Sequence, residues 1–477
     1  MKISKVLDKN VQFIKDKNNS NPDLITRYLQ FSNQSVCIMF LSELSDEEKL
    51  NQHIIMPLLS DNKKIVNWTQ IKNKITVAET EYLDSLDECI TEILKGNSVI
   101  FVNGFTKALK CATTKHEHRA VIEPPTSAVI FGPREGFIET AKVNMNLIRK
   151  RLPSTSLKFT ELNIGKYTKT KVVLAYLTDI ADDKLVKKIE TRLRKINIDG
   201  IVDSHYLISF LEEKQGSMFK QIGKTEKPDI AVAKMLEGRV AIIVDGSPIV
   251  LTLPFVILED IQNSDDYYQR NVKISIVRVL RIISVLISIL LPGTYVAIQL
   301  YHYRIIPLKF LVSIINGTQG IPFTPFLEML FVILLFEILF EASLRMPKYL
   351  GIAVSIVGAL VLGDTAVKAG LISSPAVMII AVTGISFYTL PEETSQLSIL
   401  RMLFTLLGGT FGLLGIVVGG LMLVNYLVDF NGYGSPYLAP YAPYIKSDLK
   451  DGLIRKEVNK NKTRPKSIPN KNRNRMD

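Results

Sequence analysis

Apolar and polar positions follow two different patterns along the chain, and the change lies near residue 281. Before it, short apolar runs alternate with amphipathic stretches; after it come long apolar stretches that carry almost no charge. A helix needs about 20 predominantly apolar residues to cross a membrane, and its internal hydrogen bonds satisfy its backbone there. The later part, 282–430, is therefore predicted to be an α-helical multi-span membrane domain. Its apolar segments are 282–303, 349–363, 369–391, 402–428 and, with three glutamates, 326–342.

The part before the change is predicted to be an α/β domain of two small subdomains, 34–118 and 119–257, after a polar segment over 1–33. In the first subdomain, apolar runs of strand length at 35–41 and 97–102 enclose amphipathic stretches with the period of a helix. A strand–helix–helix–strand unit is the expected result. The polar segment before it is expected to be only partly ordered, because it offers few apolar residues to bury.

The second subdomain and the segment that follows it carry clearer local signals. Apolar positions repeat with the helical period over 137–152, and two apolar runs around Asp245-Gly246 predict a hairpin over 239–253. Asp, Tyr and Arg then dominate 258–281. We interpret this segment as a juxtamembrane collar, because tyrosine favours the headgroup level and basic residues favour the cytoplasmic side. The first span is thus expected to enter the membrane from the cytosol.

The distribution of charge bears on the topology. The chain has a formal net charge of +12, and 446–477 contributes +7 of it through 11 Lys and Arg against 4 Asp and Glu. Basic residues are enriched on the cytoplasmic side of membrane proteins. The basic C-terminal tail, 431–477, is therefore expected in the cytosol, which requires an even number of spans. The first ten residues lack the apolar stretch of a signal peptide, so the α/β domain is expected in the cytosol too.

Charged residues inside the apolar part are candidates for an ion path. Glu337, Glu341 and Arg345 are spaced i, i+4 and i+8 and share one face of a helix, and Glu341 to Arg345 has the favoured order for an ion pair. Asp364 and Lys368 repeat this spacing. Charges at membrane depth normally face the interior of a helical bundle, water or each other. Three interpretations therefore stay open: a buried pair that holds helices together, a path for ions or substrate, or a segment that lies at the membrane interface.

Small residues recur at every fourth position in two of the apolar segments. This spacing lets helices approach closely and is usual in packed bundles and oligomers. We therefore predict a helix-packing role for these positions, and a pore lined by small residues is the alternative. The positions are Ser355, Ala359, Gly363, Gly408, Gly412, Gly415 and Gly419.

The sequence shows no signature of catalysis, of a cofactor or of a metal site, and we do not expect an enzyme. The loop 132–136 is bounded by glycines and precedes a helix, but it lacks the Lys-Ser/Thr of a phosphate-binding P-loop. The five histidines are scattered, which argues against a metal cluster. No basic and aromatic array points to nucleic acid as a partner.

Several blocks of sequence closely resemble those of GerA-type spore germination receptor A subunits. They are EPPTSAVIFGPREGFIETAKVNMNLIRKRL at 123–152, KTEKPDIAVAKMLEGRVAIIVDGSPIVLTLP at 224–254, DDYYQR at 265–270, EASLRMP at 341–347, and 351–363. The blocks occur in order and cover about 120–445. One departure concerns Asp364, where such subunits usually have Gln or a small residue after the glycine of their third span; this puts a pore role for that position in doubt.

The resemblance implies a function that composition and spacing do not. It implies a cytosolic two-part N-terminal domain and a membrane domain, in a complex with B and C subunits in the spore inner membrane. It also implies a homo-oligomer of A subunits that forms a nutrient-gated ion channel, with the nutrient bound by the B subunit. Membrane lipid is then a further partner.

Two rival functions remain open from the sequence. A secondary transporter would suit a span broken at Pro292 and carboxylates near the membrane midplane, although the two halves of the apolar part show no internal repeat. A GerA-like protein that accompanies the dipicolinate channel of spores would share most of the motifs. Genes for B and C subunits, or for the dipicolinate channel, beside this one would separate the last possibility from a germinant receptor.

Overall fold

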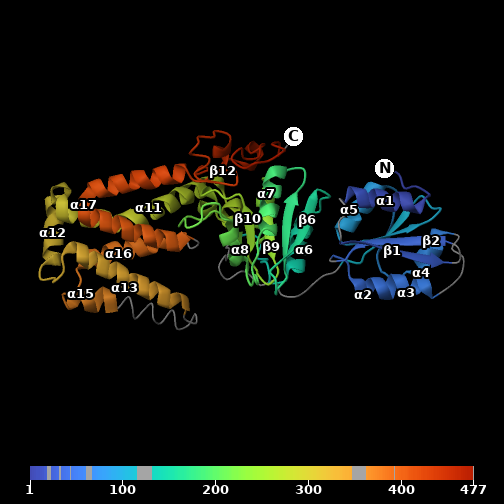
Figure 1. Ribbon diagram of the computed structural model, residues 1–477, viewed down its shortest axis with the longest axis horizontal. Coiled ribbons are helices and arrows are strands. Elements are labelled where there is room, and N and C mark those ends of the chain that lie inside the picture. The colour runs from blue at the N-terminus through green and yellow to red at the C-terminus, as the bar shows by residue number, and fades with distance from the viewer. Residues whose placement is uncertain are drawn as a thin grey trace.

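The structure is a computed structural model that describes residues 1–18, 23–31, 34–42, 44–60, 67–114, 131–345, 361–390 and 393–475. Figure 1 shows an elongated arrangement of these residues, in which two α/β subdomains follow one another and a bundle of helices lies beyond the second. The predicted division into an α/β part and an apolar helical part is therefore seen in the described residues.

The first subdomain is a five-stranded antiparallel sheet in the order β1-β2-β4-β5-β3. Helices cover both of its faces, so alternate side chains of β2 point into two different cores. The strand is apolar from Val36 to Leu41, where both faces are buried. The strands are β1 (Leu24–Phe31), β2 (Gln34–Leu41), β3 (Thr80–Leu83), β4 (Ser98–Val102) and β5 (Ala108–Cys111). The helices are α1 (Leu7–Lys17), α2 (Glu47–Leu50), α3 (Met56–Leu59), α4 (Trp68–Lys74) and α5 (Leu86–Leu94), and a π-helical turn joins α2 to α3.

The expectation that 1–33 is only partly ordered is wrong for most of that segment. β1 pairs with β2 along its whole length, and α1 packs on the sheet through Leu7, Val11 and Ile14. These three apolar positions have the spacing of one helical face, but the polar residues between them dominate the composition. The first subdomain therefore begins near the start of the chain.

The second subdomain repeats this architecture, with the strand order β6-β7-β9-β10-β8. The predicted hairpin is confirmed, because β9 and β10 pair antiparallel around Gly246. The helix predicted over 137–152 begins later, since the Phe137 N–H donates to the Glu226 carbonyl at 2.7 Å instead of starting a helix. The strands are β6 (Leu157–Ile164), β7 (Thr170–Leu177), β8 (Gly223–Thr225), β9 (Val240–Val244) and β10 (Val250–Leu253). The helices are α6 (Ala141–Arg151), α7 (Asp183–Arg194), α8 (Ser204–Leu211) and α9 (Pro228–Met235).

Two helices of the apolar part, α11 and α17, are long and apolar enough to cross a membrane by length and composition, and α12 and α16 are shorter apolar helices. The predicted segment 326–342 falls within α13, while most of 349–363 lies outside the described residues. The helices are α10 (Leu258–Ile261), α11 (Asn271–Tyr301), α12 (Leu308–Thr318), α13 (Pro325–Arg345), α15 (Ala366–Lys368), α16 (Ser374–Phe387) and α17 (Thr394–Val428), with a π-helical turn at Val361–Thr365.

The expectation of a single final span over 402–428 is wrong, because α17 reverses its direction at Gly412. This glycine has a φ of 63° and a ψ of −149°, which no helix contains. A Cβ on Gly419 would lie 2.6 Å from Leu407 Cδ1, whereas a straight helix would separate these two positions by about 18 Å. α17 is therefore a helical hairpin whose halves pack against each other (Figure 1).

This hairpin begins and ends beside the second subdomain. At its start, Glu393 lies 3.6 Å from Lys220, and just after its end the Asp429 carbonyl accepts a hydrogen bond from Lys214 at 3.5 Å. Its turn lies at the far end of α11, where the Tyr301 hydroxyl donates to two backbone carbonyls of the first half, at 2.9 and 3.1 Å. The two halves of α17 thus run along the helical domain in opposite directions.

The C-terminal tail packs on the second subdomain as far as residue 475 (Figure 1). The Tyr433 hydroxyl donates to the Leu211 carbonyl at 2.5 Å, and Lys471 forms an ion pair with Asp183 at 2.6 Å. Short antiparallel strands, β11 (Asn431–Gly432) and β12 (Ser435–Pro436), start the tail. The α/β part and the tail therefore lie at the same end of the helical domain.

Candidate functional site

A buried ion pair holds the helical domain together, but its partners differ from those that the spacing predicts. Glu337 on α13 pairs with Arg401 on α17 and not with a residue one turn away on its own helix. The Arg401 side chain is 1% exposed and lies between the rings of Phe336 and Phe387, 5.2 and 5.0 Å from their centroids. Ser398 adds a hydrogen bond to the Glu337 carboxylate at 2.5 Å. The charges of Glu337 and Arg401 thus neutralise each other within a single chain.

Removing Glu337 is expected to cost about 3–5 kcal/mol, because the Arg401 charge is left buried and uncompensated. Removing Arg401 should cost less, because the Glu337 side chain is 29% exposed. Glu337→Gln and Arg401→Met should therefore each lower the unfolding temperature of the purified chain, and the double variant should recover part of the loss. Arg345→Gln is the control, since exposed pairs contribute about 0–1 kcal/mol. Equal effects of the buried and the exposed variants would contradict this role.

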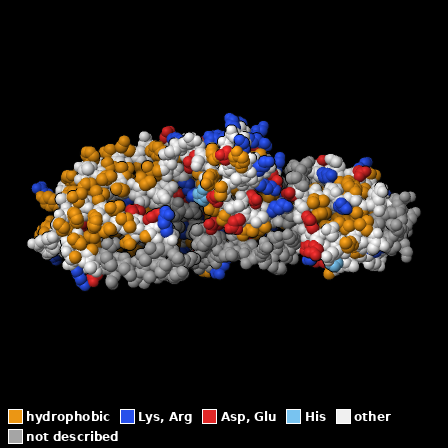
Figure 2. Space-filling model, turned by 60° about the horizontal axis from the view of Figure 1, so that its bottom comes forward, with side chains coloured by type: hydrophobic (Ala, Val, Ile, Leu, Met, Phe, Trp, Pro, Cys, Tyr) orange, Lys and Arg blue, Asp and Glu red, His pale blue; other side chains and the backbone are white. Residues whose placement is uncertain are grey.

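The two predicted i, i+4 pairs form, and both lie on the surface of the helical domain. Arg345 and Glu341 are 2.6 Å apart, with side chains 79% and 58% exposed, and Lys368 and Asp364 are 2.7 Å apart and also exposed. In the single chain, the Glu341–Arg345 pair is therefore exposed. Figure 2 shows many apolar side chains on the described surface of this domain, and Leu334 and Ile338, on the same face of α13 as Glu341 and Arg345, are exposed. The Glu341–Arg345 pair thus interrupts an apolar helix face.

The structure assigns different roles to the small residues. A Cβ on Gly408 would lie 2.3 Å from the carbonyl oxygen of Gly293 on α11, so this glycine lets two helices touch through their backbones. Gly412 makes the turn of the hairpin. Gly415 and Gly419 face the first half of the same hairpin, and therefore do not locate a contact between subunits. A Cβ on Gly363 would meet no atom of the described residues within 4 Å, and Ser355 and Ala359 lie outside that part of the chain.

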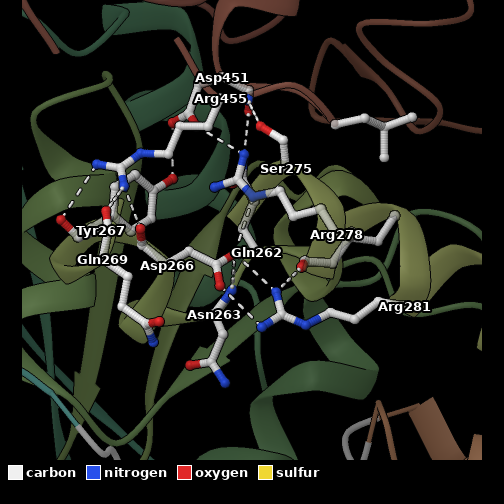
Figure 3. Close-up of polar contacts among 12 residues, drawn as sticks. Gln262, Asn263, Asp266, Tyr267, Gln269, Ser275, Arg278, Arg281, Asp451 and Arg455 are labelled. Carbon is white, nitrogen blue, oxygen red and sulfur yellow. Dashed lines mark hydrogen bonds and ion pairs between the residues drawn. The ribbon is translucent and has the colours of Figure 1, made fainter. Parts of the chain in front are cut away.

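A group of charges that the sequence did not predict joins the collar, α11 and the tail (Figure 3). We call Asp266, Arg278, Arg281, Asp451 and Arg455 the junction cluster. The Asp266 carboxylate accepts hydrogen bonds from Arg278 at 3.0 Å and from Arg281 at 2.8 and 3.0 Å. Arg278 also reaches Asp451 of the tail at 3.0 Å. The Arg278 and Asp266 side chains are 0% and 1% exposed, so this central pair of the cluster is shielded from water.

Arg455 completes the cluster from the tail. Its guanidinium donates to the backbone carbonyls of Asp266, Tyr267 and Gln269, the last at 3.2 Å, and the Tyr267 hydroxyl donates to Asp451 at 2.9 Å. Arg278 and Arg281 of the collar therefore contact carboxylates of the protein, whereas Arg270 and Lys273 are exposed. The cluster thus links the tail to the collar and to α11.

A second contact fastens the start of the tail. The Glu213 carboxylate accepts from the Tyr433 N–H at 2.9 Å and pairs with Lys188 and, at 3.5 Å, with Arg192. Burial raises the pKa of Glu213, but these hydrogen bonds and charges outweigh it and hold the pKa below its usual value. The carboxylate is therefore ionised at neutral pH, and the link between tail and subdomain is intact there.

Comparisons with known proteins agree with the blocks seen in the sequence. The family model described as Bacillus/Clostridium GerA spore germination protein matches residues 12–467. The membrane protein YfkQ of Bacillus subtilis (strain 168) is 35% identical over 439 residues, which cover 91% of this chain and 85% of that protein. Spore germination protein KA of the same organism is 34% identical over 475 residues, 98% of this chain and 87% of that protein.

Among solved structures, the chain is similar to the N-terminal domain of the A subunit of the Bacillus megaterium spore germinant receptor GerK3. That match is 26% identical, has a TM-score of 0.42, and covers 53% of this chain and 96% of the other. The family assignment rests on the sequence matches, which run through the α/β subdomains, the helices and most of the tail. The chain belongs to the GerA family of spore germination proteins.

Proposed function

We propose that this chain is the A subunit of a spore germinant receptor in the spore inner membrane, where it assembles with B and C subunits. In this proposal, several copies of the helical domain line a nutrient-gated ion path. The observation that carries it is that two ion pairs, Glu341–Arg345 and Asp364–Lys368, are exposed on the surface of an apolar domain. Such charges are costly against lipid and normally face protein or water. Phe340 packs against Tyr388, so in the membrane placement given below Glu341 and Arg345 lie at the cytoplasmic end of α13, and we propose that the exposed surface there lines the cytoplasmic mouth of the path.

The membrane placement that we propose has an even number of spans. It is supported by the hairpin of α17, which starts and ends beside the second subdomain, and by the tail, which packs on that subdomain. The +7 charge of 446–477 favours the cytoplasmic side for this end. The α/β part and the tail would then both lie in the cytosol.

Cysteine labelling tests this placement on a background without Cys37, Cys89 and Cys111, which are buried and unpaired. Gln319→Cys lies beyond α12 at the far end, and Asn472→Cys lies in the tail; both positions are exposed. A membrane-impermeant reagent should label Gln319→Cys in intact cells or right-side-out vesicles, and Asn472→Cys only in inverted ones. Labelling of both from the same side would contradict the proposed topology.

The ion path is tested by Glu341→Gln in the spore-forming host. An exposed pair adds about 0–1 kcal/mol to stability, so the amount of protein should stay normal. Loss of a carboxylate on the path should change ion release, because rings of carboxylates set cation preference. Potassium release after nutrient addition and immunoblotting measure the two effects. Glu457→Gln, an exposed carboxylate of the tail, is the control. Normal potassium release in both Glu341→Gln and Asp364→Asn would refute the proposed path.

Assembly needs a separate test, which also separates the rival functions. A tagged chain should co-purify with the B and C subunits encoded beside it. Co-purification with dipicolinate-channel proteins instead would favour the related accessory role. If a single copy of the chain exchanged solutes across the membrane without partner subunits, this result would favour a transporter.

A further inference from the structure

A cavity of about 680 Å³ lies where the second subdomain, the ends of the long helices and the tail meet. Its wall includes Lys234 on α9, Arg281 on α11, Tyr388 just after α16, and Lys456 and Arg475 of the tail. Its volume is within the range of about 300–1,000 Å³ that is usual for small-molecule sites. The cavity therefore has room for a ligand that would touch all three parts of the chain at once.

The carboxylates of this cavity are already neutralised by protein cations. Each of the six that line it lies within 4.0 Å of a lysine or arginine. The pairs are Asp229–Lys227, Glu237–Arg239, Glu259–Lys234, Asp260–Lys220, Glu393–Lys220 and Asp451–Arg278. At Glu259, burial raises the pKa of the carboxyl, but the charges of Arg239 and Lys234 outweigh it and keep the pKa below its usual value. Each of these acids thus has a cation beside it, with Lys220 shared between Asp260 and Glu393.

Basic side chains slightly outnumber acidic ones in the wall of the cavity. The lining residues include seven Lys and Arg and six Asp and Glu, a net charge of +1. The surplus lies toward the tail. Arg455 bonds to backbone carbonyls, Lys456 makes no ion pair among the described residues, and Arg475 reaches Glu237 only at 4.0 Å. Such a set favours an anion, and phosphate is the group that arginine and lysine bind best.

The residues around the cavity favour a lipid headgroup as the source of the phosphate. Tyr388, Thr389 and Leu390, which follow α16, form part of the wall, and Arg281 on α11 has Leu280 and Ile283 as exposed apolar neighbours, 54% and 45% accessible. In the proposed membrane placement, these residues lie at the cytoplasmic surface, where headgroups meet acyl chains. Tyrosine and basic residues favour this level. A lipid could therefore put its headgroup into the cavity and its chains along α11.

We propose that this cavity binds the phosphate of an anionic lipid headgroup and that the bound lipid joins the tail to α11 and to the end of α16. The proposal rests on the membrane placement given above and goes beyond it, because it assigns a specific lipid site. Free phosphate or a soluble phosphate ester has the same chemistry, so the test must separate these two sources.

The experiment uses the full chain in nanodiscs of phosphatidylcholine, with or without phosphatidylglycerol. Native mass spectrometry counts bound phosphatidylglycerol, and titration of this lipid against the unfolding temperature gives the affinity. The site variant is Lys456→Gln/Arg475→Gln. The control is Lys462→Gln/Lys466→Gln, which removes the same charge from exposed tail positions outside the cavity. Inorganic phosphate added to the discs without phosphatidylglycerol is the soluble arm.

We expect the site variant to bind phosphatidylglycerol roughly 30-fold more weakly, from the typical contribution of two basic residues at an anionic surface, and the control to bind like the unmodified chain. Equal losses in both variants would show general surface attraction and overturn the site, as would unchanged binding in both. Stabilisation by inorganic phosphate equal to that by the lipid would overturn the lipid source. A chain that stays outside the discs would instead contradict the proposed membrane placement itself.

Discussion

Arg278→Ala is expected to lower the free energy of unfolding by about 3–5 kcal/mol, the usual cost of breaking a buried ion pair. Arg278 is fully buried and contacts Asp266, Asp451 and the Gly452 carbonyl. Without it, Asp266 keeps only Arg281 as a cation, and Asp451 loses the contact that ties the tail to α11. We therefore expect a lower unfolding temperature and a tail that proteases cut more readily.

Arg270→Ala is the matched control for this prediction. Arg270 lies on the same collar, eight residues earlier, and its side chain is exposed, so the same change of charge should alter stability little. Thermal unfolding of the purified chain, together with limited proteolysis followed from the C-terminus, measures both effects. An Arg278→Ala protein with a protected tail and a normal unfolding temperature would show that the junction cluster does not hold the tail.

Gly408→Ala is expected to separate α11 from the first half of α17. The added Cβ would lie 2.3 Å from the carbonyl oxygen and 2.9 Å from the carbonyl carbon of Gly293, and backbone atoms in the middle of a helix cannot move aside locally. Overpacking of a tight contact usually costs about 1–3 kcal/mol and sometimes more. The helical domain should unfold at a lower temperature or fail to accumulate, while the α/β subdomains stay folded.

Gly420→Ala separates this effect from a general effect on helix formation. Gly420 lies in the second half of α17, and a Cβ there would meet no atom within 4 Å. Alanine is favoured over glycine in a helix by about 1 kcal/mol, so this variant should be neutral or slightly more stable. Circular dichroism during heating distinguishes the outcomes. Equal stability of the two variants would mean that α11 and α17 do not touch at Gly408.

The elements that depend on local pattern were predictable from the sequence. β9 and the part of β2 from Val36 to Leu41 are continuous apolar runs because helices cover both faces of each sheet. The Asp245-Gly246 turn joins β9 to β10 as expected. α1 was missed because its three core residues are diluted by lysines and asparagines. β6 was missed for a similar reason, since only Phe159, Leu162 and Ile164 of its eight residues are buried.

The contacts that make the candidate site were mostly beyond prediction, because they join distant parts of the chain. Spacing shows that Glu341 and Arg345 share a turn, but it cannot show that Glu337 meets Arg401, 64 residues away. The partner of Arg278 in the tail is 173 residues away, in a segment whose composition suggests a free end. The reversal at Gly412 depends on a positive φ. Glycine can adopt this conformation, but a glycine in the sequence does not show that it does.

The current through the purified chain, reconstituted in a planar bilayer with its B and C subunits, tests the central claim most directly. A potassium gradient across the bilayer gives a reversal potential that reports whether cations or anions pass. If the face with Glu341 lines the path, the unmodified receptor should be cation-selective when nutrient is added, and Glu341→Gln should move the reversal potential toward zero. Inserted receptor that passes no current, or a reversal potential that Glu341→Gln leaves unchanged, would contradict the claim that this face conducts ions.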